Sequence, residues 1–229
     1  MSKNNIIKLE NVNYTITEGT KARILLNDIS CNFLKSSITV ISGPSGSGKT
    51  TLLYAIAGLL DNVKGNIFID GTNINVNDEK KRNAFRLENI SMVFQNLNLF
   101  SFMNVEDNIL VPYYIKEKKV DSSVYELLRK YLEVMKLGQI QKKSIQSLSG
   151  GEQQRVAIIR ALIDEPKVVL CDEPTANLDR ENVEIFMKTL LEIKQTTNAS
   201  IIIVTHDSRV YEYGEKKIHI TDGKLSSVD

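Results

Sequence analysis

The segment GPSGSGKT, residues 43–50, combines three glycines with a lysine and a threonine. Glycines in such a loop let backbone N–H groups wrap around phosphate oxygens, the lysine supplies a point charge to the β- and γ-phosphates, and the threonine hydroxyl ligates Mg²⁺. The alternative is a chance glycine-rich turn, but the full match lies between an apolar run and a helical pattern, as a phosphate loop requires. The predicted contacts of a nucleoside triphosphate are Gly43, Pro44, Ser45, Gly46, Ser47, Gly48, Lys49, Thr50 and Thr51.

Two adjacent carboxylates, Asp172 and Glu173, follow the apolar run at 167–171. Ligands bind at the carboxyl edge of a parallel sheet, where both side chains would emerge. We expect Asp172 to hold the Mg²⁺ shell through water and Glu173 to orient and deprotonate the attacking water. Acidic residues after a strand often only cap the next helix, but a phosphate loop on the same sheet favours the catalytic interpretation.

Two further polar side chains follow apolar runs. His206 comes after the run at 200–205 and is expected at the same edge, within reach of a γ-phosphate, although a lone histidine there is usually solvated or capping. Gln95 leaves another apolar run, where its amide would reach both the metal and the attacking water. The predicted catalytic residues are therefore Glu173, His206, Gln95 and Lys49. The predicted metal ligands are Thr50, Gln95 and Asp172.

The stretch SLSGGEQQ places Ser149, Gly150 and Gly151 before a helix whose apolar positions recur at helical spacing. Uncovered N–H groups at the positive end of a helix suit an anion. A serine cap accounts for Ser149 and one glycine at most, so the second glycine indicates an anion that comes from elsewhere.

Continuous apolar, β-branched runs predict buried strands of a parallel sheet at 38–42, 167–171 and 200–205. The segments at 6–16 and 65–74 alternate between apolar and polar residues and predict a half-exposed antiparallel sheet. The predicted fold class is therefore α/β, with a parallel-sheet core and an antiparallel side sheet.

The pattern becomes helical between residues 96 and 150. One helix is expected within 121–138, with Ser123 and Glu126 as its capping box and Gly138 at its end. Its apolar face is Val124, Leu127, Leu128, Tyr131 and Met135. We therefore expect residues 1–95 and 151–229 to form the core of one domain, and residues 96–150 to form an inserted α-helical subdomain.

Composition and the lengths of the apolar runs argue against several classes of protein. The chain has 229 residues, 42% of them hydrophobic, so it can bury a sizeable core, and a net charge of +1 argues against a nucleic-acid partner. Its apolar runs are too short to span a bilayer and its first residues do not resemble a signal peptide, so we expect a cytoplasmic protein. Cys31 and Cys171 lie in strand-like runs and are expected to be reduced core thiols.

In their order and spacing, GPSGSGKT, Gln95, LSGGEQQ, VVLCDEP, NLD and His206 resemble the ATP-binding cassette (ABC) ATPases over nearly the whole chain. The resemblance implies a P-loop NTPase fold, ATP and Mg²⁺ as ligands, and ATP hydrolysis. It also implies that Ser149, Gly150, Gly151, Glu152 and Asp179 contact the ATP held by the phosphate loop of a second copy, in a head-to-tail dimer.

The segment FQNLNLFSFMNVEDNILVPYYI resembles the lipoprotein-release, macrolide-export and antimicrobial-peptide-resistance branch of that family. The resemblance implies an integral membrane permease as a separate subunit, with this chain peripheral on the inner face of the membrane. Phe100, Phe102 and Met103 are candidates for the docking surface, the alternative being packing within the helical segment. Ala176 departs from the glycine more usual in the branch.

The adenine contact also departs from the family pattern. The family stacks an aromatic residue on adenine at a register that gives Ile16 here, while Tyr14 lies two residues earlier on the same strand face. Tyr14 is the predicted substitute, the alternatives being aliphatic contact with the base and an ordinary strand aromatic.

Two other functions are alternatives to a transport ATPase. A non-transport ABC ATPase acting on ribosomes, chromosomes or damaged DNA usually carries tandem cassettes, long coiled coils or zinc modules, which this sequence lacks. A regulator that senses ATP without turnover would normally lose Glu173 or His206, and both are present.

Overall fold

The computed structural model describes residues 4–176 and 178–228. Its strands are β1 (Asn5–Glu18), β2 (Lys21–Leu34), β3 (Ile38–Ser42), β4 (Lys64–Ile69), β5 (Thr72–Asn73), β6 (Ile90–Val93), β7 (Val168–Asp172), β8 (Ser200–Val204), β9 (Lys216–Thr221) and β10 (Lys224–Val228). Its helices are α1 (Lys49–Ile56), α2 (Glu79–Asn89), α3 (Val105–Ile115), α4 (Ser122–Val134), α5 (Gly150–Leu162), α6 (Arg180–Thr196) and α7 (Ser208–Tyr211), with a 3-10 turn, η1 (Ile145–Ser147).

The larger sheet has the strand order β10-β9-β3-β8-β7-β6. Its strands pair in parallel except for β10, which is antiparallel to β9. Every residue of β7 and β8 is buried, because both faces of this sheet are covered. The three predicted core strands and their parallel pairing are confirmed.

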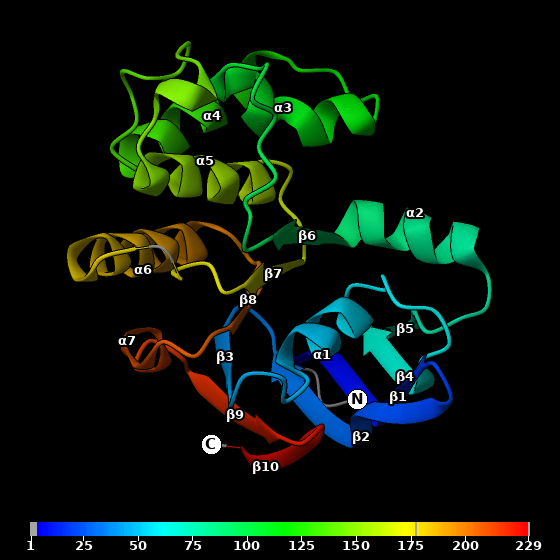
Figure 1. Cartoon of the computed structure of the whole chain (residues 1–229). Helices are drawn as coiled ribbons and strands as arrows, with labels where there is room; N and C mark the ends of the chain where they lie inside the picture. The colour runs from blue at the N-terminus through cyan, green and yellow to red at the C-terminus, as the bar shows by residue number, and fades with distance from the viewer. Residues whose placement is uncertain (1–3, 177, 229) are drawn as a thin grey trace.

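Alternate residues of the large sheet face two separate cores. Ile201 and Ile203 pack with α3, α4, α5, α6 and α7 on one face, whereas Ile202 and Val204 pack with α1 and the second sheet on the other. Figure 1 shows the two layers, with α3, α4 and α5 at the top and α1 below the level of β6 and β7. The helices that begin at Lys49 and at Gly150 therefore cover opposite faces of one sheet.

The second sheet has the order β2-β1-β4-β5 and is antiparallel throughout, which confirms the predicted side layer. Its inner residues, such as Ile7, Leu9 and Ile67, are buried against α1 and the large sheet. The backbone N–H of Asn27 on β2 donates to the carbonyl of Gly223 at 2.8 Å, which joins the two sheets near the phosphate loop.

The range 96–150 contains α3, α4 and η1, as the sequence predicts, but both predicted ends of α4 are wrong. Asp121 caps the helix and accepts hydrogen bonds from the backbone N–H groups of Ser123 and Val124, so Ser123 and Glu126 form no capping box. The helix ends before Gly138, because Lys136 takes the left-handed conformation with φ 56°. Asp and Ser are both preferred caps, and here the helix begins one residue after Asp121.

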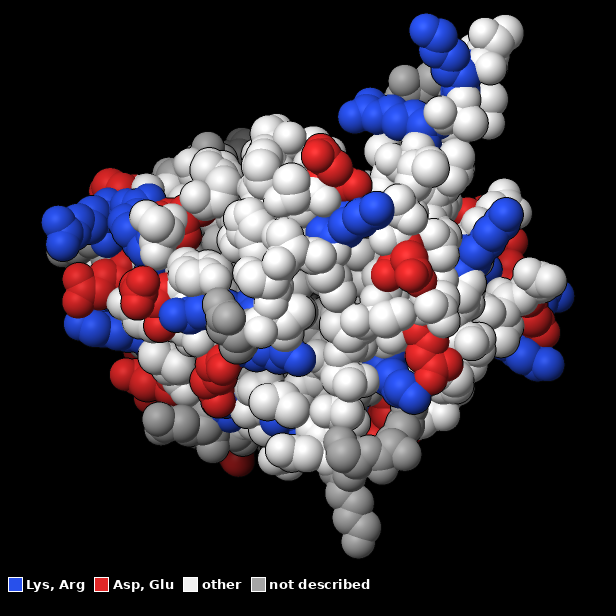
Figure 2. Space-filling model, turned by 90° about the horizontal axis from the view of Figure 1, so that it is seen from below, with Lys and Arg blue, Asp and Glu red and all other residues white. Residues whose placement is uncertain are grey.

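The surface carries charges of both signs. In Figure 2, Lys and Arg side chains lie among Asp and Glu side chains over the coloured part of the face seen from below. Cys31 is half-buried and Cys171 is buried, both as free thiols, and burial raises the pKa of each to about 12. Among the described residues, no helix has the length and apolar character needed to cross a membrane.

Candidate functional site

The phosphate loop joins β3 to α1 at the edge of the large sheet. The Lys49 side chain is 7% exposed, and its ammonium donates to the carbonyls of Gly43 at 2.9 Å and Pro44 at 2.8 Å. These bonds hold the lysine side chain across its own loop, where its positive charge is available to bind an anion. The hydroxyl of Ser47 is also buried, with no hydrogen-bond partner among the described residues.

Two loop glycines are required by their surroundings. Gly43 has φ 146°, and a Cβ there would lie 2.1 Å from the carbonyl oxygen of Ile220. Gly48 has φ 102°, and a Cβ there would lie 2.5 Å from the carbonyl oxygen of Leu25 on β2. The loop backbone is therefore pressed between β9 and β2, and any other residue at either position would displace it.

Two of the three predicted metal ligands, Thr50 and Asp172, are in contact at the edge of the sheet. The Thr50 hydroxyl donates to the Asp172 carboxylate at 2.9 Å. Burial is the main reason that the pKa of Asp172 is raised, and the neighbouring charge of Glu173 adds to it. A desolvated carboxylate with an adjacent hydroxyl is a hard oxygen donor set of the kind Mg²⁺ takes.

The described residues contain no group of three or more His, Cys, Asp or Glu side chains that could enclose a metal by themselves. Mg²⁺ keeps several waters and binds through one or two protein oxygens plus substrate phosphates, so Thr50 and Asp172 next to a phosphate loop fit it. A metal bound there neutralises phosphate charge.

Glu173 and His206 form a pair at the same edge. Glu173 accepts from His206 twice, with 2.9 Å to Nδ1 and 3.3 Å to the backbone N–H. The Glu173 side chain is 14% exposed and that of His206 70%, so the histidine lies on the solvent side. Glu173 has φ 47°, a strained conformation for a non-glycine residue and one that clusters at functional sites.

The parallel register brings Gln95 to this pair. Val93 on β6 is aligned with Cys171 on β7, so Gln95 and Glu173 each stand two residues beyond the same level. The preceding residue, Phe94, packs edge-on against Tyr54 with 6.5 Å between the ring centroids. Gln95 itself is exposed. The sheet thus gathers Gln95, Asp172, Glu173 and His206 beside the phosphate loop, as the sequence predicts.

Ser149 begins α5 with a capping box that the sequence analysis missed. Its hydroxyl donates to the Glu152 carboxylate at 2.8 Å, its backbone N–H donates to the same carboxylate at 2.7 Å, and the Glu152 N–H lies 3.3 Å from the hydroxyl. The backbone N–H of Ser149 is the largest cause of a lowered pKa at Glu152. The serine three residues before a glutamate, S-x-x-E, was the signal for this box.

The two glycines after Ser149 differ in what they contact. A Cβ at Gly150 would meet nothing within 4 Å, so the chain's own packing does not require glycine there. A Cβ at Gly151 would lie 3.2 Å from Asn182 Oδ1. Asn182 donates to the Asp179 carboxylate at 2.8 Å from its backbone and at 3.0 Å from its side chain, so Asp179 lies near the start of α5.

Tyr14 lies on β1 of the side sheet. It is aligned with Leu26 on β2, which is fully buried, and its ring packs against the core beneath the side sheet. A separate cavity of about 150 Å³ adjoins the loop and is lined by Arg23, Leu25, Gly46, Gly48, Lys49, Thr50 and Thr51. Tyr14 is not among its lining residues, and its contact with adenine stays a prediction.

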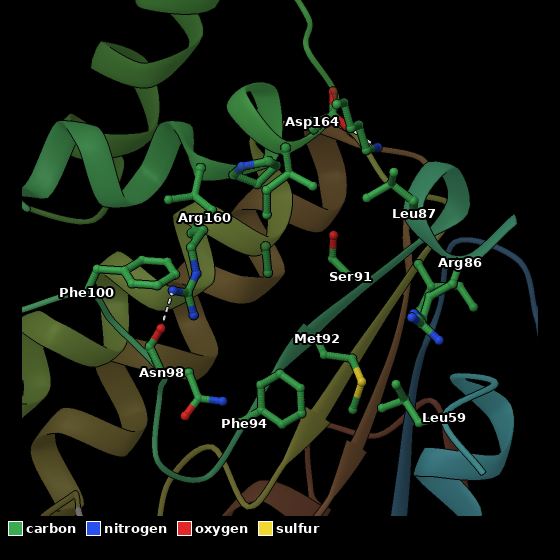
Figure 3. Close-up of a pocket in the computed structure, with 16 residues that line it drawn as sticks. Leu59, Arg86, Leu87, Ser91, Met92, Phe94, Asn98, Phe100, Arg160 and Asp164 are labelled. Atoms are coloured by element: carbon green, nitrogen blue, oxygen red, sulfur yellow. Dashed lines mark hydrogen bonds and ion pairs between the residues drawn. The ribbon is translucent and has the colours of Figure 1, made fainter. Parts of the chain in front are cut away.

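A larger groove of about 330 Å³ opens between β6, α2, α3 and α5 (Figure 3). Its apolar walls include Leu59, Leu87, Phe94, Phe100 and Ile115. Phe102 lies beside the groove and is 80% exposed. Its ring packs against that of Phe100, with 5.7 Å between the ring centroids. Met103 is half-buried.

The ABC transporter family pattern matches residues 26–176, more than half of the chain. The chain is similar to the uncharacterized ABC transporter ATP-binding protein MJ0796 of Methanocaldococcus jannaschii, at 34% identity over 96% of this chain and 95% of that protein. It is also similar to the lipoprotein-releasing system ATP-binding protein LolD of Buchnera aphidicola subsp. Schizaphis graminum, at 36% identity over 97% of each.

A solved structure of MJ0796 has the same fold. It is described as the dimeric structure of a post-hydrolysis state bound to ADP and Pi, and it matches with a TM-score of 0.87 and 31% identity over 97% of each chain.

Asp172→Asn removes a desolvated charge and keeps an oxygen for the Thr50 hydroxyl. Because the raised pKa means that the folded chain holds this proton more tightly than the unfolded chain, wild-type stability falls as the pH rises from the ordinary Asp range through the raised pKa. Without metal or nucleotide, we expect Asp172→Asn to lack this fall in stability with rising pH and to be more stable than wild type at neutral pH. Urea unfolding at a series of pH values measures this difference.

Asp78→Asn is the matched control, because the Lys81 N–H lowers the pKa of Asp78 and gives a pH slope of the opposite sign. If Asp172→Asn is less stable than wild type at neutral pH, the carboxylate is not a strained, metal-ready group.

Proposed function

This chain belongs to the ABC transporter ATP-binding proteins, and from that premise we propose that it powers an exporter of lipoprotein, peptide or antibiotic type. It is an ATPase that uses ATP and Mg²⁺, acts as a dimer, and has a membrane permease as its partner. The export assignment is supported by LolD, which is a lipoprotein-releasing protein by name. We place the chain on the cytoplasmic side of the membrane, held there by the permease.

One observation carries the catalytic proposal: the Thr50–Asp172 contact and the Glu173–His206 pair lie together at one sheet edge, where the adjacent strands β7 and β8 end. Lys49 and the loop amides hold the β- and γ-phosphates. The Thr50 hydroxyl and Asp172 orient the metal. Glu173 takes a proton from the attacking water, and His206, tied to Glu173, donates a hydrogen bond to the γ-phosphate.

Gln95 stands on the neighbouring strand and completes the arrangement. Its amide has both a donor and an acceptor, so it is suited to contact the metal shell and the attacking water together. Its exposure leaves the side chain room to turn toward a bound nucleotide.

The start of α5 supports a shared site. Ser149 and Gly150 are exposed, and the space around Gly150 is open, so another molecule can approach the helix N-terminus closely. Because α5 and α1 cover opposite faces of the sheet, the helix that Ser149 begins lies across the sheet from the helix that follows the phosphate loop (Figure 1). We assign Ser149, Gly150, Gly151, Glu152 and Asp179 to the γ-phosphate of the ATP on the second copy.

The groove in Figure 3 is the proposed seat of the permease. Its apolar walls, with Phe102 and Ile115 exposed at 80% and 61%, suit the apolar face of a helix. Arg86 and Asp164 line the same groove, where Asp164 pairs with Lys116 and Lys118. Charged groups around an apolar seat fix the register of what docks.

Glu173→Gln keeps the size of the side chain and removes the base. We expect ATP hydrolysis to fall by about a hundredfold or more, while ATP still binds and holds two subunits together. Size-exclusion chromatography with light scattering, with and without ATP and Mg²⁺, measures the dimer. A variant that stays monomeric at high protein concentration with saturating ATP would contradict the shared site.

Two further variants test the geometry of sharing. Both variants are made in the Glu173→Gln background. Lys49→Ala removes the positive charge that faces the phosphates, and Ser149→Arg places a bulky cation against the neighbour's nucleotide. Each alone should abolish the ATP-dependent dimer. When the two are mixed, head-to-tail sharing leaves one composite site with both defects and the other intact, so a mixed dimer with one ATP is expected. The absence of any mixed dimer would contradict this pairing.

Phe100→Ser with Phe102→Ser tests the groove. Because Phe102 is 80% exposed and Phe100 39% exposed, we expect a loss of unfolding free energy of about 1 kcal/mol at most and normal ATPase activity of the isolated chain. Binding to the co-expressed permease should be lost, as measured by co-purification from membranes. Val228→Ser, an exposed apolar residue on β10, is the control. A large drop in melting temperature would instead assign the two rings to internal packing.

A further inference from the structure

The guanidinium of Arg160 on α5 holds the loop that follows Gln95. It donates to the carbonyl of Asn98 at 2.7 Å and to the carbonyl of Leu97. Burial lowers the pKa of Arg160, and arginine remains charged at neutral pH despite such a shift. Figure 3 shows this side chain reaching from α5 toward Asn98, between Phe94 and Phe100.

The loop at this point is strained. Leu97 and Asn98 are consecutive residues with φ 56° and 48°, and the left-handed conformation costs a leucine roughly 1–2 kcal/mol. The strain turns both carbonyls toward one side, where a single planar guanidinium meets them. A charge-assisted hydrogen bond contributes about 1.5–3 kcal/mol, enough to offset the strain.

A second anchor holds the other end of the same loop. The Asn108 side chain on α3 is fully buried, accepts from the Phe100 N–H at 2.8 Å and donates to the Phe100 carbonyl at 3.0 Å. Helices α3 and α5 pack together. The loop after Gln95 is thus fastened to the helical layer, whereas Gln95 itself follows β6 of the sheet.

The position of Gln95 therefore depends on its backbone on both sides. On one side, Val93 is fixed by its register with Cys171 and Phe94 by its contact with Tyr54. On the other side, Leu97 and Asn98 are fixed by Arg160. Gln95 is exposed, so contacts of its own side chain contribute less to its placement than these anchors.

We propose that Arg160 is a positioning residue for Gln95, which ties the metal-facing glutamine to the helix that begins at Ser149. The proposal rests on the proposed function, because it takes Gln95 to be a contact of the Mg²⁺ on bound ATP. Lysine is not equivalent here, since an ammonium on a flexible stem does not bridge two carbonyls as the guanidinium fork does.

Arg160→Ala and Arg160→Lys test the proposal, with Arg86→Ala as the matched control. Arg86 lines the opposite wall of the same groove, and its guanidinium donates to the Gly58 carbonyl at 3.2 Å rather than to the Gln95 loop. All three variants and wild type are compared by thermal unfolding, by hydrogen–deuterium exchange of the amides in residues 94–103 without nucleotide, and by ATP binding without metal. Mn²⁺ binding is measured by electron paramagnetic resonance in the presence of a non-hydrolysable ATP analogue.

For Arg160→Ala we expect faster exchange at 94–103, unchanged ATP binding without metal, and Mn²⁺ affinity weakened about tenfold, the size of effect seen when a supporting partner of a metal ligand is lost. Arg160→Lys should recover part of the Mn²⁺ affinity. Arg86→Ala should match wild type in hydrogen–deuterium exchange at 94–103 and in Mn²⁺ affinity.

Other results overturn the proposal. If exchange rises but Mn²⁺ affinity does not change, Arg160 serves loop structure alone. If Arg86→Ala weakens Mn²⁺ as much as Arg160→Ala does, the effect belongs to the groove as a whole. If wild type binds no Mn²⁺ with the analogue, the proposed function itself fails, and the exchange data still report whether Arg160 holds the loop.

Discussion

The parallel register of the large sheet is the constraint on which the site depends. Ile41 and Asp172 are both aligned with Val204, so the strands that carry the phosphate loop, the carboxylates and His206 end at one level. Asp172 lies at that level, Glu173 one residue beyond it and His206 two residues beyond it. A slip of one residue in any pair would turn a side chain to the other face of the sheet. The buried, two-faced sheet makes such a slip costly, since every residue of β7 and β8 is packed.

Sequence patterns predicted the parts of this arrangement that are local. The continuous apolar runs predicted β3, β7 and β8, because strands covered on both faces read that way. The phosphate loop was predicted because its glycines, lysine and threonine act within eight residues. The cap of α4 was misassigned because both Asp121 and Ser123 satisfy the cap preference, and only the backbone geometry decides which one accepts the N–H groups. Helix α2 has a strongly polar sequence and no buried residue, so no apolar pattern marked it.

Contacts between distant residues could not be predicted. Tyr54 packs against Phe94 across 40 positions of sequence, and Arg160 reaches Asn98 across 62, and neither pair has a spacing that a local pattern encodes. Both arise because α1 and α5 are laid against the sheet by apolar residues elsewhere on each helix. The placement of Tyr14 also depends on a distant residue: its partner in the register, Leu26, is fully buried, and this pairing directs the ring toward the core.

The two cores give the molecule two bodies that meet at the large sheet, and the site draws on both. Asp172, Glu173 and His206 belong to strands of the sheet, whereas Ser149 and the anchors Arg160 and Asn108 belong to the helical layer. Gln95 is attached to the sheet by the strand before it and to the helical layer by the loop after it. A shift of the helical layer against the sheet must therefore be absorbed in part by the few residues around Gln95, where the backbone is already strained at Leu97. A groove bounded by both bodies is the place where an outside segment can produce that shift.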